Sequence, residues 1–241
     1  MNGAPYPPPG HRPPSIRDFY AFEAHVATAR RARGLDMDPE WYEAPVFYFT
    51  NPAAVIGDGD VVRFPPTSAE WDYELEVACV IGTECHDVPA AGEAWLDVVA
   101  GFTLMDDFSA RDLQRRELRQ GLGPAKGKDF ATALGPVLVP ATSLPGSATG
   151  RPRAALSASV NGIERSRGEL ADITFPWPAL LAHASRDTVL VPGDVIGSGT
   201  VGTGCLLELR AVGGDEPPWL RRGDVVELAA DGIGVLRNIV G

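Results

Sequence analysis

The chain has 241 residues, a formal net charge of −11, 27 glycines and 22 prolines. So much glycine and proline excludes a coiled coil or a helical bundle, and a composition of 44% apolar and 22% charged residues excludes a disordered chain. The acidic balance argues against nucleic acid and membranes as partners, because both are polyanions.

The N-terminal stretch differs from the rest, since six prolines fall within residues 1–14. We expect an extended arm there that stays outside the core, followed by one domain over 15–241. No signal peptide is evident, no apolar run approaches about 20 residues, and three widely spaced cysteines indicate a reducing compartment. The sequence therefore predicts a soluble, cytoplasmic protein.

The first predicted element is a helix over 15–33. Ser15 and Asp18 have the spacing of a capping box, arginines gather near the far end, and Gly34 follows. On such a helix Asp18 and His25 would share a face, separated by about 10 Å along the axis. His25 would then be the only histidine that shares a helix face with a carboxylate.

The rest of the chain reads mainly as strands. We expect strands over 46–49, 56–64, 72–81, 101–105, 135–139, 154–160, 190–196, 205–212 and 225–228. Helices are predicted over 93–100, 109–120 and 172–183. The predicted class is therefore a strand-rich α+β fold.

Two carboxylates stand out in the strand over 72–81. Glu74 and Glu76 point the same way, because alternate residues of a strand share a face. A half-buried strand with a charged solvent face explains this pattern, and so does a divalent cation that relieves the repulsion between the two charges. The residues alone leave both interpretations open.

A second acidic pair, Asp106 and Asp107, comes at the junction of a buried strand and a helix. It suits either a helix N-terminus or a functional site at a strand end. Residues 111–128 then hold six basic and two acidic side chains, a local excess of positive charge. That excess fits either an anionic substrate or a solvated helix face. Because the candidate ligands are all oxygen donors, Mg²⁺, Mn²⁺ or Ca²⁺ is favoured over Zn²⁺.

Together these segments resemble the fumarylacetoacetate hydrolase superfamily from about residue 15 to the end. The resemblance rests on blocks in a specific order: Asp18-Phe19-Tyr20 with His25, Glu74-Leu75-Glu76, Met105 to Gln114, Gly127-Lys128-Asp129-Phe130, Val160-Asn161-Gly162, Pro192 to Thr200, and Gly223 to Asn238. It implies the fold of the family's C-terminal catalytic domain, a mixed β-sandwich roll that is often a homodimer.

The resemblance also implies roles for individual residues. The implied metal ligands are Asp18, Glu74, Glu76 and Asp107, with Mg²⁺ or Mn²⁺ as the cation and Ca²⁺ as an alternative. The implied catalytic residues are His25, as general base, and Lys128. The implied substrate contacts are Tyr20, Arg111, Gln114 and Thr200.

One expected residue is missing from these blocks, namely the acid that pairs with the catalytic histidine. One branch of the family has Glu three residues after the histidine, where this chain has Thr28. Another branch takes it from a loop after the Gly-Thr turn, and residues 199–205 carry no acid. Glu23, Glu40 and Glu43 are the remaining candidates.

Three functions follow from this interpretation. The first is a metal-dependent hydrolase that cleaves a C–C bond in a β-diketone or acylpyruvate-type acid through a metal-stabilised enolate. The second is a decarboxylase, tautomerase, isomerase or lyase that uses the same enolate without attack by water, which the missing acid favours. The third is an inactive relative that binds a metal or ligand. All three have a small anionic oxo acid as the partner.

Overall fold

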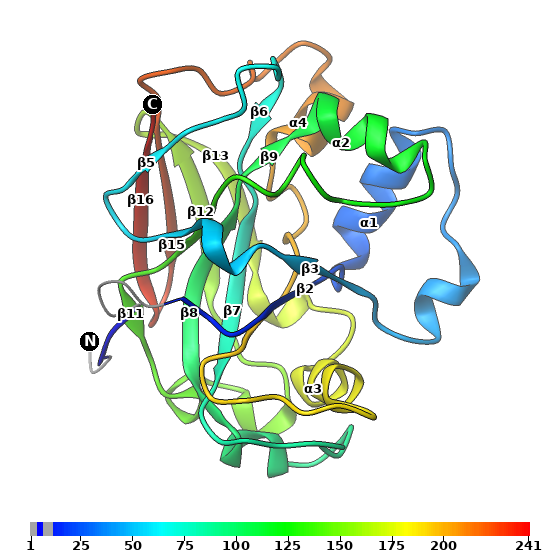
Figure 1. Ribbon diagram of the computed structural model, residues 1–241, viewed down its shortest axis with the longest axis vertical. Coiled ribbons are helices and arrows are strands. Elements are labelled where there is room, and N and C mark those ends of the chain that lie inside the picture. The colour runs from blue at the N-terminus through cyan, green and yellow to red at the C-terminus, as the bar shows by residue number, and fades with distance from the viewer. Residues whose placement is uncertain (1–3, 7–11) are drawn as a thin grey trace.

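The structure is a computed structural model that describes residues 4–6 and 12–241. Within these residues, two β-sheets pack against each other and helices cover their margins (Figure 1). The order of the larger sheet is β3-β2-β14-β7-β8-β10-β4, and that of the smaller sheet is β13-β12-β15-β16-β5. Both sheets mix parallel and antiparallel pairs, which confirms the strand-rich α+β class and the mixed β-sandwich.

The strands of the larger sheet are Ile16–Phe19 (β2), Phe47–Thr50 (β3), Val55–Ile56 (β4), Leu75–Ile81 (β7), Val99–Asp107 (β8), Thr132–Leu134 (β10) and Val195–Gly197 (β14). Those of the smaller sheet are Val61–Val62 (β5), Ala155–Val160 (β12), Ile163–Glu169 (β13), Val225–Ala230 (β15) and Gly234–Val240 (β16). Two short pairs complete the set: Ala4–Pro5 (β1) with Val137–Leu138 (β11), and Trp71–Asp72 (β6) with Ser109–Ala110 (β9).

The α-helices are Glu23–Arg31 (α1), Arg111–Leu118 (α2), Trp177–Ser185 (α3) and Leu206–Gly213 (α4). Short 3-10 helices occupy Pro39–Tyr42 (η1), Pro52–Ala54 (η2), Ala94–Asp97 (η3), Ala141–Ser143 (η4), Ser147–Thr149 (η5) and Leu170–Asp172 (η6). Helices α1, α2 and α4 gather on one side of the sheets, and α1 contacts α4 (Figure 1). No helix in the described ranges has the length and apolar content needed to cross a bilayer.

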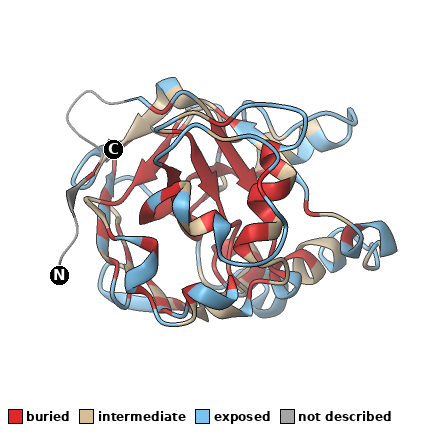
Figure 2. Cartoon of the chain, turned by 90° about the horizontal axis from the view of Figure 1, so that it is seen from below, coloured by how far each residue is buried: buried red, intermediate tan, exposed pale blue. Residues whose placement is uncertain are grey.

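The main core lies between the two sheets. Val77 and Cys79 of β7 face this core together with Leu104 of β8 and Leu156 of β12. All seven residues of β7 are buried, so this strand reads as a continuous apolar run apart from its glutamate. Figure 2 shows the buried strands enclosed by exposed loops and helices.

The predicted helix over 15–33 is wrong in its first half. Ile16–Phe19 is strand β2, and the helix begins only at Glu23. Strand β2 is buried on both faces between β14 and β3, so tertiary pairing overrides the local capping signal. The Ser15 hydroxyl donates to Asp194 at 2.6 Å instead of capping a helix. Asp18 and His25 therefore do not share a helix face.

The predicted strand over 205–212 is also wrong, because Leu206–Gly213 forms helix α4. The backbone N–H groups of Leu206 and Leu207 donate to the Asp72 carboxylate at 2.7 and 3.0 Å. Such an acceptor at a helix N-terminus stabilises the helix, and Asp72 is more than 130 positions away in the sequence. The sequence pattern also left out β2, β13 and β16.

The N-terminal arm departs from expectation at one residue. Most of residues 1–14 lie outside the described residues, but Ala4–Pro5 pairs with β11 and Tyr6 is buried. Tyr6 packs with Ile16 and Met105 in a smaller apolar cluster on the other face of the larger sheet. The phenol ring therefore joins the core, because the pairing of β1 holds it there.

Candidate active site

The sheet registers bring the predicted acidic residues together. Asp18 on β2 lies beside Gly197 of β14, and β14 pairs next with β7, which carries Glu76. Strand β7 pairs with β8 so that Leu75 lies opposite Asp106, which places Asp107 near Glu74 and Glu76. Strands β2, β7 and β8, with the residue before β7, thus bring carboxylates to one end of the larger sheet.

These carboxylates form a buried cluster. Oxygen atoms of Asp18, Glu74 and Asp107 all lie within 4.8 Å of one another. Glu76 lies alongside, with its Oε1 accepting from the Thr200 hydroxyl at 3.3 Å. Each of the four acids is at most 3% exposed. The charged solvent face considered for Glu74 and Glu76 is therefore excluded.

Two buried cations hold Glu74. Lys128 Nζ contacts Glu74 and lies 2.8 Å from Asp107 Oδ2. The Arg111 guanidinium donates to Glu74 at 2.7 Å, to Asp72 at 2.8 Å and to Gln114 at 3.0 Å. Burial opposes the ionisation of Glu74, but Lys128 and Arg111 outweigh it and lower the pKa of Glu74 to about 2.

The pKa values of the other acids in the cluster are raised instead of lowered. Burial, together with the nearby Asp107 charge, raises the pKa of Asp18 to about 8. Burial and the Asp18 charge raise the pKa of Glu76 well above its usual range. A protonated Glu76 can donate a hydrogen bond to Asp18. Among the described residues, no other group bonds to Asp18 Oδ1 or Glu76 Oε2. Carboxylate oxygens that only a shared proton satisfies, in a cluster of like charges, fit a divalent cation such as Mg²⁺, Mn²⁺ or Ca²⁺.

The predicted base finds its acid in helix α4. His25 Nδ1 lies 2.8 Å from Glu208 Oε2, and both side chains are buried. Glu208 is held in place by the backbone N–H groups of Thr203 and Gly204, which donate to its two oxygens at 3.1 and 3.0 Å. An acid in contact with Nδ1 leaves Nε2 to face other groups.

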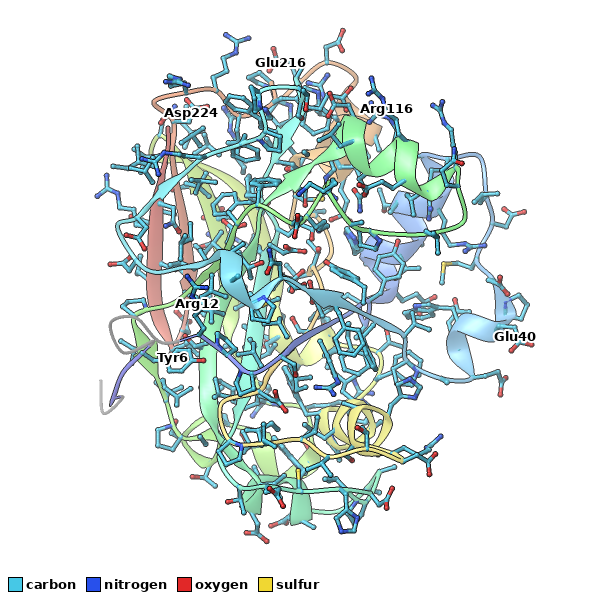
Figure 3. The ribbon with its side chains drawn as sticks, in the orientation of Figure 1. Tyr6, Arg12, Glu40, Arg116, Glu216 and Asp224 are labelled. Atoms are coloured by element: carbon cyan, nitrogen blue, oxygen red, sulfur yellow. The ribbon has the colours of Figure 1, made fainter. Side chains whose placement is uncertain are left out.

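The three acids suggested by the sequence do not serve this role. Glu23, Glu40 and Glu43 are all exposed, and Glu23 accepts from the Tyr42 hydroxyl at 2.7 Å. Glu40 lies at the outer edge of the molecule (Figure 3). The sequence pattern missed Glu208 because the segment around it was read as a strand. The only signal for a helix was the spacing of Leu206 and Leu209.

A cavity of about 410 Å³ opens onto these groups. It is lined by eight of the ten predicted site residues: Tyr20, His25, Glu74, Glu76, Arg111, Gln114, Lys128 and Thr200. Asp18 and Asp107 lie behind it, bridged by the hydroxyl of Tyr48. Tyr48 also lines the cavity, and its residue type and position in an aromatic strand gave no indication of this role.

The outer part of the cavity differs from its floor. Its walls carry the apolar side chains of Val46, Leu118 and Pro124, together with Arg33 and Arg115. Arg33 is exposed, whereas Arg115 is paired with Glu70 at 2.6 Å. The remaining basic side chains of residues 111–128 do not converge on the cavity; Arg116, for example, extends from α2 at the surface (Figure 3).

Comparisons with known proteins agree with this geometry. The family model described as "Fumarylacetoacetate (FAA) hydrolase C-terminal" matches residues 15–241. An oxaloacetate tautomerase of Bacillus subtilis is 34% identical over 203 residues, which cover 83% of this chain and 62% of that protein. The chain thus spans less than two thirds of that relative.

Solved structures share the fold, and two of them are enzymes with different activities. A 5-carboxymethyl-2-hydroxymuconate delta-isomerase from Mycobacterium smegmatis has a TM-score of 0.72 and 28% identity, covering 94% of this chain and 76% of that one. A fumarylpyruvate hydrolase from Pseudomonas aeruginosa, in complex with Mn²⁺ and pyruvate, has a TM-score of 0.74 and 25% identity, covering 98% and 97%. These relatives are enzymes, and they span tautomerase, isomerase and hydrolase activities.

Proposed function

Because the chain belongs to the fumarylacetoacetate hydrolase family, we propose that it is a divalent-metal-dependent hydrolase of a small oxo acid. In a β-diketone or acylpyruvate-type acid, the bond cleaved joins the distal carbonyl carbon to the carbon between the two carbonyl groups. The observation that carries the proposal is the contact of His25 with Glu208 beside the acidic cluster. This contact gives His25 the acidic partner that a general base needs to activate a water molecule.

The proposed ligands of the cation are Asp18, Glu74, Glu76 and Asp107. The burial of all four acids and the oxygens Asp18 Oδ1 and Glu76 Oε2, to which no other described group bonds, support this assignment, and Mg²⁺ or Mn²⁺ suits an all-oxygen set. When bound, the cation would supply Lewis-acid polarisation of the substrate oxygens and neutralise the acids.

In the proposed reaction His25 takes a proton from a water molecule, whose oxygen attacks the carbonyl carbon distal to the carboxylate. Glu208 stabilises the imidazolium that forms. The C–C bond then breaks, its electron pair passes to the pyruvate-like fragment as an enolate, and a proton is added to carbon. The products are one carboxylic acid and one 2-oxo acid, so the elements of one water molecule are consumed.

The floor of the cavity supports a position for the anionic end of the substrate. Lys128 and Arg111 lie on the floor, where a positive charge stabilises a substrate carboxylate or a developing oxyanion. Gln114, Tyr20 and Thr200 line the same floor and are proposed to orient the substrate. Burial raises the pKa of Tyr20 to about 12, so its hydroxyl stays a hydrogen-bond donor at neutral pH.

A second candidate is a tautomerase or decarboxylase that needs proton transfer but no attack by water. The 34% identity to an oxaloacetate tautomerase favours it. Homodimer formation and a cytoplasmic location stay predictions.

A panel of 2-oxo and 2,4-dioxo acids, with Mg²⁺ or Mn²⁺ present and products followed by NMR, separates the candidates. Hydrolysis yields two carbonyl fragments, decarboxylation releases CO₂, and tautomerisation conserves mass. We expect two fragments from an acylpyruvate, and loss of their formation in His25→Ala with cation binding retained. Undiminished hydrolysis by that variant would remove the proposed role of His25, and tautomerisation alone would favour the second candidate.

A further inference from the structure

A second cluster of metal-ligating atoms lies on the other side of His25. A ring nitrogen of His25, Cys205 Sγ and a Glu208 carboxylate oxygen all lie within 4.8 Å of one another. Cys205 Sγ is 3.6 Å from Glu208 Oε2, and all three side chains are at most 4% exposed. Helix α1 contributes His25, while Cys205 is the N-cap of α4 and Glu208 lies in its first turn.

The donor set of this cluster differs from that of the acidic cluster. An imidazole nitrogen, a sulfur and a carboxylate oxygen are the ligands that Zn²⁺ takes. Tetrahedral bonds of the usual length place such ligands about 3.3–3.7 Å apart. Cys205 Sγ and Glu208 Oε2 have this separation, at 3.6 Å, whereas His25 Nδ1 is closer to Glu208 Oε2, at 2.8 Å, and would move outward on binding. Mg²⁺ and Ca²⁺ prefer oxygen and have no comparable affinity for a thiolate.

The imidazole nitrogen that faces this cluster has Glu208 as its one close polar neighbour among the described residues. Among the described residues, no group forms a hydrogen bond to His25 Nδ1, although Glu208 Oε2 is 2.8 Å away. In the tautomer that has its proton on Nε2, Nδ1 has a lone pair to offer to a cation. A cation bound there would replace the contact between Nδ1 and Glu208 that the proposed mechanism uses.

The cluster lies between two cavities. His25 lines the cavity of about 410 Å³ described above, and Glu208 lines a second cavity of about 280 Å³. Thr28 of α1, Arg167 of β13 and Thr203 also line the second cavity. The second cavity gives an ion an approach to Glu208 and leaves space for water as a fourth ligand.

We propose that His25, Cys205 and Glu208 form a second cation site, selective for thiophilic divalent ions such as Zn²⁺, whose occupation inhibits the enzyme. On binding, the bond between Cys205 Sγ and its proton is replaced by a bond to the cation, and the proton leaves to solvent. Burial raises the pKa of the Cys205 thiol, so it is neutral until such an ion displaces the proton. The inhibitory role rests on the proposed function, because a bound cation would remove His25 and Glu208 from proton transfer. The binding of the cation does not depend on that function.

Co²⁺ tests the site without reference to activity. With the oxygen ligands saturated by Mg²⁺, titration with Co²⁺ should produce a thiolate-to-cobalt charge-transfer band in the near ultraviolet, saturating at one equivalent per chain. Cys205→Ala and Cys205→Ser should both lose the band, whereas Cys85→Ala, at a half-buried cysteine elsewhere, should keep it. Two substitutions of Cys205 are made because one of them could prevent folding. A melting curve shows which variant is folded, and one folded variant is enough for the test. No band in the wild type, or an undiminished band in a folded Cys205 variant, would overturn the proposal.

Zn²⁺ inhibition is then measured at saturating Mg²⁺, each variant against its own uninhibited rate. We expect the inhibition constant to rise at least about tenfold in Cys205→Ala and to stay unchanged in Cys85→Ala. A cobalt band without zinc inhibition would overturn the inhibitory role while the site stands. If no substrate of the panel is turned over, the proposed function fails, and the cobalt band still decides whether the site exists.

Discussion

Replacing Glu208 by Gln tests the acid that completes the proposed base. The carboxylate accepts from Thr203 N–H at 3.1 Å and Gly204 N–H at 3.0 Å, and it lies 2.8 Å from His25 Nδ1. An amide keeps the shape of the side chain but has only one acceptor oxygen and no charge. The imidazolium formed when His25 takes a proton from water then has no counter-charge beside it.

The expected size of the effect follows from this geometry. A positioned general base contributes roughly 10²–10⁴-fold to rate, so kcat should fall about 100-fold or more, or about 3–5 kcal/mol of barrier. KM should change little, because Glu208 lines the second cavity rather than the one proposed for the substrate. One backbone N–H is left without an acceptor, which should cost about 1–3 kcal/mol of stability.

The assay follows loss of the ultraviolet absorbance of the best 2,4-dioxo acid of the panel at saturating Mg²⁺. A melting curve and Mn²⁺ titration show whether the fold and the cation site persist. Glu23→Gln is the matched control, since this exposed acid lies two positions from His25 and should leave kcat unchanged. A folded Glu208→Gln protein with kcat within about threefold of wild type would refute the reasoning.

Three further predictions concern the acidic cluster. Glu76→Gln should weaken Mn²⁺ binding at least about 100-fold, as measured by calorimetry. Asp97→Asn, at an exposed acid, is the control and should leave Mn²⁺ binding unchanged. An unchanged Kd in Glu76→Gln would remove Glu76 from the ligand set. In the metal-free protein the pKa of Asp18, raised to about 8, gives stability that is full below the unfolded pKa of about 4 and is lost as pH rises through about 8. Its Tm should therefore fall between about pH 5 and pH 9 and saturating Mg²⁺ should oppose the fall, whereas a rising metal-free Tm contradicts the argument. A Cβ at Gly197 would lie 2.4 Å from Asp18 Oδ1, so Gly197→Ala should lower the free energy of unfolding by about 1–3 kcal/mol and weaken Mn²⁺ binding. Gly213→Ala is the control, because a Cβ there meets open space and should change neither property. Equal behaviour of the two variants would contradict the packing argument.

The parts of the site that depend on short motifs were predictable from the sequence. Residue type and order singled out Glu74 and Glu76 and the pair Asp106 and Asp107 as candidates, and the family resemblance implied the ligand set, with Asp107 and Asp18 in it. All ten predicted residues lie in or directly behind one cavity. Local reasoning could not decide whether the glutamates faced solvent, because that depends on which strands cover β7. The neighbours of β7 are β8 and β14, and β14 lies more than 110 positions away.

The parts that failed depend on contacts remote in the sequence. Ile16–Phe19 became a strand because β14 and β3 provide its hydrogen-bond partners. Leu206–Gly213 became a helix with Asp72 as the acceptor at its N-terminus. A short stretch of sequence does not show these distant hydrogen-bond partners. Within such a stretch, a capping signal or an apolar run is compatible with both a helix and a strand. The error in α4 mattered most, since it concealed Glu208.

The net charge of −11 is not only a property of the surface, because several of the acids are buried around the site. Two buried cations, Lys128 and Arg111, face seven buried carboxyl groups around the site. These are Asp18, Asp72, Glu74, Glu76, Asp106, Asp107 and Glu208. Such an excess cannot stay ionised at low dielectric, and the raised pKa of Asp18 expresses that cost as bound protons. A divalent cation would replace those protons and remove the repulsion, so its binding and the folding of this region should be linked. The proposed cation is then as much a part of the fold as of the chemistry, and its removal should lower Tm as well as activity.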